Sequence, residues 1–205
     1  MTPKEQALSM VPEAIKWANA AANALNVILG FNGKRSDIVN LNEFKAQKTH
    51  FHIELSPPRR SILRFLRLPF VDSDPTEALL QDVRSRYWDI MRALSQPSIF
   101  LDSPATGEGE GATAFVPRNR DGTLRITPYF QAVGPLMQVK TLVHEAAHFL
   151  GDAFQDFAYR NRKDDEDKDR YITLPVQYAI RNADSYGYFA FQMAKGVDRI
   201  LDQDE

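Results

Sequence analysis

LMQVKTLVHEAAHFL, residues 136–150, is the most informative stretch of this 205-residue chain. Its apolar residues recur at helical spacing and Gly151 follows it directly, so we expect a largely buried helix that ends at this glycine. His144 and His148 lie four residues apart, which places both imidazoles on one helical face where they can bind one metal ion. Glu145 lies beside that face, placed to take a proton from a metal-activated water. The HExxH motif therefore predicts a zinc site that hydrolyses peptide bonds.

A catalytic zinc site needs a third protein ligand and one open position for water. No histidine follows His148, and position 154, where HExxHxxGxxH proteins have their third histidine, is Phe154. The third ligand is therefore expected to be a carboxylate, or else to be absent. The downstream candidates are Asp152, Asp156, Glu166 and Asp184. Asp156 stands among aromatic residues and is expected to point inward with them, whereas Asp152 follows the helix-ending glycine and Glu166 lies in a charged stretch.

The composition excludes several classes of protein. Lys and Arg number 25 against 27 Asp and Glu, a net charge of -2, so we expect no nucleic-acid partner. No apolar run approaches the ~18 residues that span a bilayer, so we expect no membrane span. The chain has no cysteine, which excludes disulfides and thiol nucleophiles. Nothing in the pattern indicates an oligomeric state.

The opening segment does not resemble a secretory signal. Residues 1–21 carry Lys4, Glu5, Glu13 and Lys16 where an uninterrupted apolar region would have to lie. We therefore expect a cytoplasmic protein, one exported by a route without a cleavable signal, or a piece of a longer protein, and the sequence does not choose among these.

The remaining pattern predicts a mainly helical α+β domain, a single one over residues 1–205. Helices are expected at 3–29, 74–96 and 136–150, and a last helical region at 175–201. The runs 112–117 and 123–130 flank an Asp-Gly pair, which indicates a hairpin and hence a small antiparallel sheet beside the HExxH helix. Two charged segments are interpreted as solvent-facing: the arginine-rich 59–67 as the flank of a short helix, and 160–170 as an exposed loop.

The two remaining histidines lie in a segment with alternating pattern. Residues 49–55, THFHIEL, are predicted to form a strand, which would place His50 and His52 on one face. There they could hold a second metal ion, but exposed or partly packed strand histidines are the preferred interpretation.

Three segments carry a resemblance to a known family. They are Asp-Phe-Ala-Tyr at 156–159, after HEAAH; NADSYGYF at 182–189; and ITPYF at 126–130. In these the chain resembles the aspzincin metallopeptidases, which include deuterolysin and the fungal peptidyl-Lys metalloendopeptidases. The resemblance is clearest over 112–191, with a looser helical similarity over 76–96.

The resemblance implies a zincin-like fold, Zn²⁺ as cofactor and a protein or peptide as substrate. It implies that Asp156 is the third zinc ligand, that Tyr159 stabilises the oxyanion, and that Asp184 lines a substrate pocket. In lysine-specific members a glutamate follows that aspartate three residues later, where this chain has Gly187. We therefore expect broad cleavage, with at most a modest lysine or arginine bias on the primed side of the cut.

Two other functions fit the same residues. A catalytically silent metal-binding or regulatory domain would keep the ligands, but the presence of both Glu145 and Tyr159 argues against it. A delivered protease toxin or effector domain would look the same in sequence as any other zinc endopeptidase of this kind.

Overall fold

The structure is a computed structural model that describes residues 1–32, 35–54, 75–160 and 165–197. Its α-helices, in chain order, are α1 (Pro3–Leu29), α2 (Asn42–Phe51), α3 (Pro75–Leu94), α4 (Pro135–His148), α5 (Asp165–Thr173), α6 (Val176–Ala179) and α7 (Ala183–Lys195). Its strands are β1 (Phe100–Asp102), β2 (Ala114–Phe115) and β3 (Leu124–Ile126). Short 3-10 helices lie at η1 (Arg35–Asn40), η3 (Pro97–Ile99) and η4 (Pro128–Gln131).

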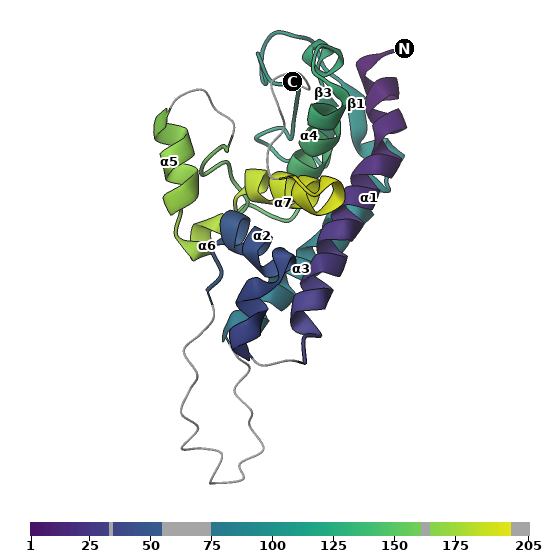
Figure 1. The fold of residues 1–205 in the computed structure, drawn as a ribbon. Coiled ribbons are helices and arrows are strands. Elements are labelled where there is room, and N and C mark those ends of the chain that lie inside the picture. The colour runs from purple at the N-terminus through teal and green to yellow at the C-terminus, as the bar shows by residue number, and fades with distance from the viewer. Residues whose placement is uncertain (33–34, 55–74, 161–164, 198–205) are drawn as a thin grey trace.

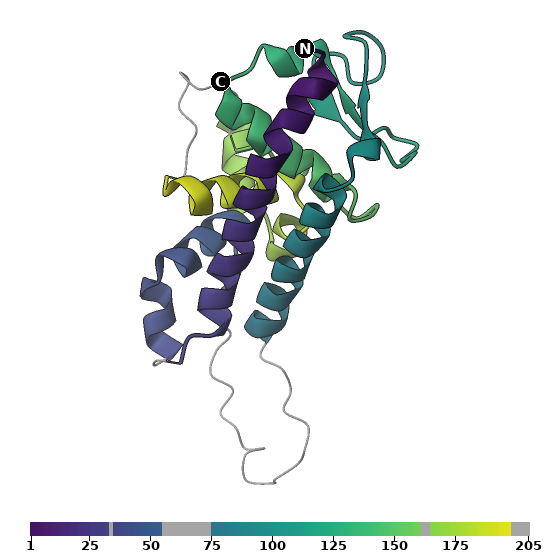
Figure 2. The same cartoon turned by 90° about the vertical axis from the view of Figure 1, so that its right-hand side faces the viewer.

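Helix α1 is the long support on which the other helices pack. A capping box begins it: Glu5 N–H donates to Thr2 Oγ1 at 3.1 Å, and Thr2 N–H donates to Glu5 Oε2 at 2.8 Å. Its buried face is rich in alanine, which lets neighbouring helices approach closely. Helix α3 runs beside it, and α4 and α7 cross it, as Figures 1 and 2 show. The predicted helix over 3–29 is confirmed.

Helix α4 carries the HExxH motif through the middle of this packing. It lies between α1 and α7, and every residue from Gln138 to Ala147 is buried. Gly151, with φ 123°, adopts a conformation that side chains resist, and it follows the last turn as the sequence predicts. The core thus holds α4 rigidly by its apolar residues, which leaves its polar face to the site.

The sheet is small and mixed. Strands β2 and β3 form the predicted antiparallel hairpin, whereas β1 pairs with β3 in parallel, in the order β1-β3-β2. The expectation of a purely antiparallel sheet is therefore corrected. The glycine-rich loop 103–113 lets the chain reverse between β1 and β2, so that β3 fits between them. The sheet lies beside the N-terminal half of α1 and against α4 (Figure 1).

Two local predictions were wrong. The described part of the predicted strand, residues 49–54, forms no strand: His50 lies in the last turn of α2, and His52 ends that helix in the left-handed conformation, with φ 55°. The helical spacing of Phe44, Gln47 and Phe51 outweighs the local alternation. Part of the charged stretch 160–170 belongs to α5 rather than to a loop. The helical region predicted over 175–201 consists, in its described part, of the two helices α6 and α7 with a break between them.

Other expectations are not tested. Residues 59–67 lie outside the described residues, so their interpretation stays a prediction. So does the single-domain organisation, although one buried apolar cluster includes residues of α1, α2, α3, α4 and α7. Among the described helices, none is long and apolar enough to cross a membrane.

His50 and His52 are hydrogen-bonded packing residues in this fold. The His50 ring is fully buried, with Nδ1 at 2.8 Å from Tyr171 Oη and Nε2 at 2.8 Å from Gln192 Oε1. His52 Nε2 lies 3.0 Å from the Tyr171 carbonyl oxygen. Neither belongs to the group of described side chains that could hold a metal. Burial, aided by the positive charge of Arg160, lowers the pKa of His50 from 6.5 to about 3.

This lowered pKa makes the contribution of His50 to stability pH-dependent. The ring stays neutral in the folded chain, while in the unfolded chain it takes up a proton below about pH 6.5. Its contribution is therefore complete above pH 6.5 and is lost as the pH falls towards 3. We expect the stability advantage of the wild type over His50→Gln to shrink between pH 6.5 and 5 in urea unfolding. Parallel pH profiles of the two proteins would contradict this assignment.

Candidate metal centre

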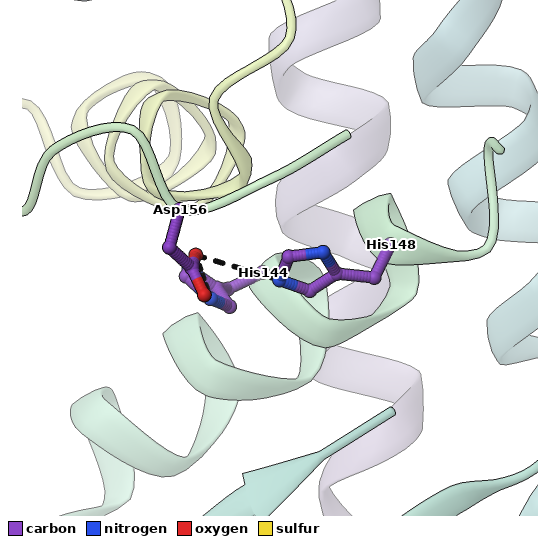
Figure 3. Close-up of side chains that lie close together, drawn as sticks. All are labelled: His144, His148 and Asp156. Atoms are coloured by element: carbon purple, nitrogen blue, oxygen red, sulfur yellow. Dashed lines mark ion pairs between the residues drawn. The ribbon is translucent and has the colours of Figure 1, made fainter. Parts of the chain in front are cut away.

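Helix α4 and the loop after it bring three potential ligands together (Figure 3). Asp156 Oδ1 lies 3.0 Å from His144 Nε2 and 3.4 Å from His148 Nε2. One donor atom from each of the three residues lies within 4.8 Å of the others. Both imidazoles therefore present Nε2 to the same carboxylate, although Asp156 comes from a separate segment.

The separations of these donor atoms fit a single metal ion. Two ligand atoms that each lie about 2.1 Å from one tetrahedral ion are roughly 3.4 Å apart. The measured 3.0 and 3.4 Å are close to that value. Two imidazoles and one carboxylate leave a fourth position open, as in catalytic zinc sites. The residues therefore suit a metal with nitrogen and oxygen ligands.

The other nitrogen of each imidazole faces an acceptor. His148 Nδ1 lies 3.3 Å from the Phe154 carbonyl oxygen, to which it donates. His144 Nδ1 is buried, and its nearest acceptor is Asp184 Oδ1, at 3.5 Å, longer than a good hydrogen bond. These contacts favour the proton on Nδ1 and leave Nε2 free to bind a cation, the usual arrangement around metal-binding histidines.

Electrostatics in the site favour a positive charge between the ligands. Burial lowers the pKa of His144, but Asp156 and Asp184 outweigh it and raise that pKa to about 10. Burial raises the pKa of Asp156, but the two imidazoles outweigh it and hold that pKa well below its usual range. Without a metal ion, the cluster therefore favours a proton on the His144 ring. A metal cation that binds the same donor atoms would displace that proton.

Glu145 and Tyr159 lie at the edge of the cluster. Glu145 is 7% exposed, with Oε1 at 3.7 Å from His144 Nε2, and burial raises its pKa. The Tyr159 ring stacks on the His144 ring, with centroids 6.0 Å apart. Burial and a hydrogen bond to Asp156 raise the pKa of Tyr159, so its hydroxyl stays protonated and can donate. Both side chains thus contact His144 but are not among the three potential metal ligands.

The side chain of Asn182 fixes the loop that carries Asp156 and Tyr159. Its Oδ1 accepts from Phe157 N–H at 3.0 Å and Ala158 N–H at 3.3 Å, and its Nδ2 donates to the Ala158 carbonyl at 2.9 Å. Backbone bonds between Gln155 and the residues on either side of Asn182 form a parallel bridge beside it. This is why the chain leaves the helix between α6 and α7.

Arg120 holds the other end of the same loop. It lies in the β2–β3 connection, and its guanidinium donates to the carbonyls of His148 at 2.7 Å and Phe154 at 3.3 Å. It also pairs with Asp152 at 3.0 Å. The residue that ends α4 and the loop that brings Asp156 are therefore joined by one side chain.

A cleft of about 820 Å³ opens over the cluster. One wall is the chain from Glu110 to Arg118, which includes β2, and the other is α4 with the loop of Asp156. The cleft is lined by Lys140, His144, Glu145, His148, Asp156 and Tyr159, among others. The potential ligands are thus reachable by a molecule in the cleft.

The other candidate residues lie outside the cluster. Asp152 is 93% exposed and paired with Arg120. The side chain of Glu166 lies outside what the structure describes. Asp184 is 1% exposed, behind His144, and is not among the residues that line the cleft. Its role in substrate binding and the roles of the other site residues stay predictions. Sequence reasoning missed Arg120 and Lys140, whose partners are distant in the chain.

Asn182→Ala is expected to loosen the loop, because the part-buried N–H of Phe157, the buried N–H of Ala158 and the Ala158 carbonyl lose their partner. We expect unfolding in urea to show a loss of about 2–4 kcal/mol of stability. Asn182→Asp keeps an acceptor for the two N–H groups and is expected to lose less. Equal stability of Asn182→Ala and the wild type would show that the loop is held by other contacts.

Comparisons with known proteins show the fold. No protein-family model matches the sequence, and no curated protein matches it. Among solved structures, a zinc peptidase from Grifola frondosa is similar, with a TM-score of 0.56 and 20% sequence identity over 95% of this chain and 98% of that chain. This chain therefore has the fold of a zinc peptidase, and the predicted mainly helical α+β class is confirmed.

Proposed function

We propose that this chain is a zinc-dependent endopeptidase of the aspzincin type, with His144, His148 and Asp156 as zinc ligands. The observation that carries the proposal is the convergence of these three side chains beside Glu145 on one wall of a cleft. The fold, shared with a zinc peptidase, supports the same function. A protein or peptide is the substrate that this combination favours.

Zinc is the metal that the donor set favours. Two imidazoles and one carboxylate, with an open fourth position, form the ligand set of several catalytic zinc sites. When bound there, zinc polarises a carbonyl and lowers the pKa of water. The contacts from His148 to Phe154 and from His144 towards Asp184 would hold the imidazoles ready for it.

The cleft also has a feature suited to an extended peptide. Strand β2 is at the edge of the sheet and pairs with β3 on one side alone among the described strands. Residues 112–117, which include β2, line the cleft across from α4. A peptide can pair with such an edge through its backbone, which places its carbonyl groups over the ligands without requiring a chain end.

In this reaction Glu145 would act as the general base and Tyr159 would stabilise the negative charge that develops on the carbonyl oxygen. The Glu145 carboxylate accepts the proton of the attacking water and returns it to the leaving amine. Its raised pKa, caused by burial, favours holding that proton between the two transfers. The Tyr159 hydroxyl, kept protonated, donates to the oxygen that becomes negative in the transition state.

Asp156→Ala is expected to lower zinc affinity by at least about 10²-fold, because one of three ligands is lost. Metal analysis after dialysis against a chelator series would measure it, with one zinc per wild-type chain expected. Asp152→Ala is the matched control, since it removes an exposed carboxylate from the same loop. Loss of zinc in the control but not in Asp156→Ala would overturn the third-ligand assignment.

Glu145→Gln is expected to keep its zinc and lose at least about 10³-fold in peptide hydrolysis, because an amide cannot accept the proton. Metal analysis and cleavage of a quenched fluorescent peptide library would measure both on one preparation. Activity close to that of the wild type would remove Glu145 from this role. A wild type that binds zinc and cleaves nothing would instead favour a silent metal-binding domain.

Tyr159→Phe is expected to lower kcat by roughly 10²-fold with little change in KM, because the hydroxyl acts mainly in the transition state. Steady-state kinetics on one peptide would separate the two constants. Tyr178→Phe, at a ring that packs on Phe157 and does not line the cleft, is the matched control. A pure KM effect would make Tyr159 a residue that positions substrate.

A further inference from the structure

Lys140 is a buried cation beside the metal centre. It lies one helical turn before His144 on α4, and its side chain is 10% exposed. Its ammonium donates to Asp184 Oδ1, on α7, in an ion pair whose acidic partner is 1% exposed. A buried charge requires such a partner, so this pair joins the two helices at the level of the ligands.

Three residues of α7, Asp184, Gly187 and Tyr188, surround this side chain, and we call the space that they form the lysine seat. The ammonium lies 4.7 Å from the centroid of the Tyr188 ring, within the range of a cation–π contact. A Cβ at Gly187 would lie 3.0 Å from Lys140 Cε and 3.3 Å from its Cγ. Any larger residue at 187 would therefore push against the aliphatic part of Lys140, which makes glycine and lysine a matched pair.

The carboxylate of Asp184 has its acceptor positions occupied from inside the protein. Oδ1 accepts from Lys140 and faces His144 Nδ1 at 3.5 Å, and Oδ2 accepts from Arg160 N–H at 2.8 Å. Lys140 lines the cleft whereas Asp184 does not. A substrate cation that approached through the cleft would therefore meet Lys140 before the carboxylate.

We propose that Lys140 determines specificity: its ammonium occupies the seat on Asp184, so the cleft does not select a lysine or arginine of the substrate there. A substrate lysine could bind Asp184 only by displacing the Lys140 ammonium, so one ion pair would replace another with no net gain. The inference rests on the proposed peptidase function. The sequence allowed a modest preference for lysine or arginine next to the cut, whereas this inference predicts no such preference. It also implies that removal of Lys140 leaves a lysine-shaped space ending in a carboxylate.

The cleavage pattern provides the first test. Fragments of a denatured protein mixture are mapped after digestion by the wild type and by Lys140→Ala. We expect no enrichment of lysine or arginine at any position next to the cut in the wild type. In Lys140→Ala we expect lysine enriched about 10-fold or more at one position. Because the readout is a ratio between sites, a lower overall activity of the variant does not obscure it.

A second test needs no peptidase activity. Thermal unfolding of the metal-free protein is followed with n-butylammonium, which copies the lysine side chain, and with n-butanol as the neutral control. We expect n-butylammonium to raise the Tm of Lys140→Ala by at least about 2 °C relative to n-butanol, and to leave the wild type unchanged. Lys195→Ala is the matched control, because Lys195 also pairs with a carboxylate, Glu13, and lies over an aromatic ring, but outside the cleft. It is expected to show no effect.

The two tests fail in different ways. If no protein cleaves but n-butylammonium stabilises Lys140→Ala selectively, the seat is real and the peptidase function is wrong. If Lys140→Ala keeps the wild-type cleavage pattern and gains nothing from n-butylammonium, the specificity role is wrong. Wild-type cuts confined to sites next to lysine or arginine would overturn it as well, whether or not the variant folds.

Discussion

The geometry of the site depends on the contacts that the buried carboxylate of Asp184 makes with two other segments. It lies at the start of α7 and contacts Lys140 and His144 on α4, and the Arg160 N–H of the loop that follows Tyr159. Burial raises its pKa, but Lys140 and His144 outweigh this and hold that pKa at about 2, so the group stays charged inside the protein. A buried charge is stable only where its partners are fixed. One carboxylate thereby joins the helix of His144 and His148 to the loop of Asp156.

The surrounding packing makes this arrangement rigid without covalent cross-links. The chain has no cysteine, so the helices are held by apolar contact. Tyr87 of α3 packs on Tyr186 and Phe189 of α7, and Phe51 of α2 packs on the same two rings. Tilted and edge-on ring pairs of this kind contribute beyond their buried area. They fix α7 where its first turn meets α4.

Local spacing made part of this site predictable from sequence. His144, Glu145 and His148 follow from helical geometry alone, and the hairpin follows from its Asp-Gly pair. Asp156 could be proposed because aromatic residues flank it in a short segment. The Lys140–Asp184 pair spans 44 residues of chain and the Arg120 contacts 28 and 34, and no local pattern reports such distances.

The strand predicted at 49–55 failed for a related reason. Alternation over a few residues is compatible with the end of an amphipathic helix, and only the residues before it distinguish the two. The helical conformation is favoured in the folded chain because it lets His50 form hydrogen bonds with Tyr171 and Gln192, which are more than 100 residues away in sequence. A buried polar side chain is placed by its hydrogen-bond partners, and these belong to the tertiary structure.

In the proposed function, one face of α4 serves both metal binding and substrate specificity. Lys140, His144 and His148 succeed one another at four-residue steps, so one helical stripe presents an ammonium and two imidazoles. Asp184 contacts the first two, so a change at Lys140 alters the charge beside His144, a proposed metal ligand, as well as the space in the cleft. Loss of the ammonium would leave the carboxylate more negative beside His144 Nδ1 and so make that imidazole a stronger donor. If the proposed roles hold, specificity and metal binding would therefore be coupled through Asp184, so that a substitution of Lys140 also affects His144.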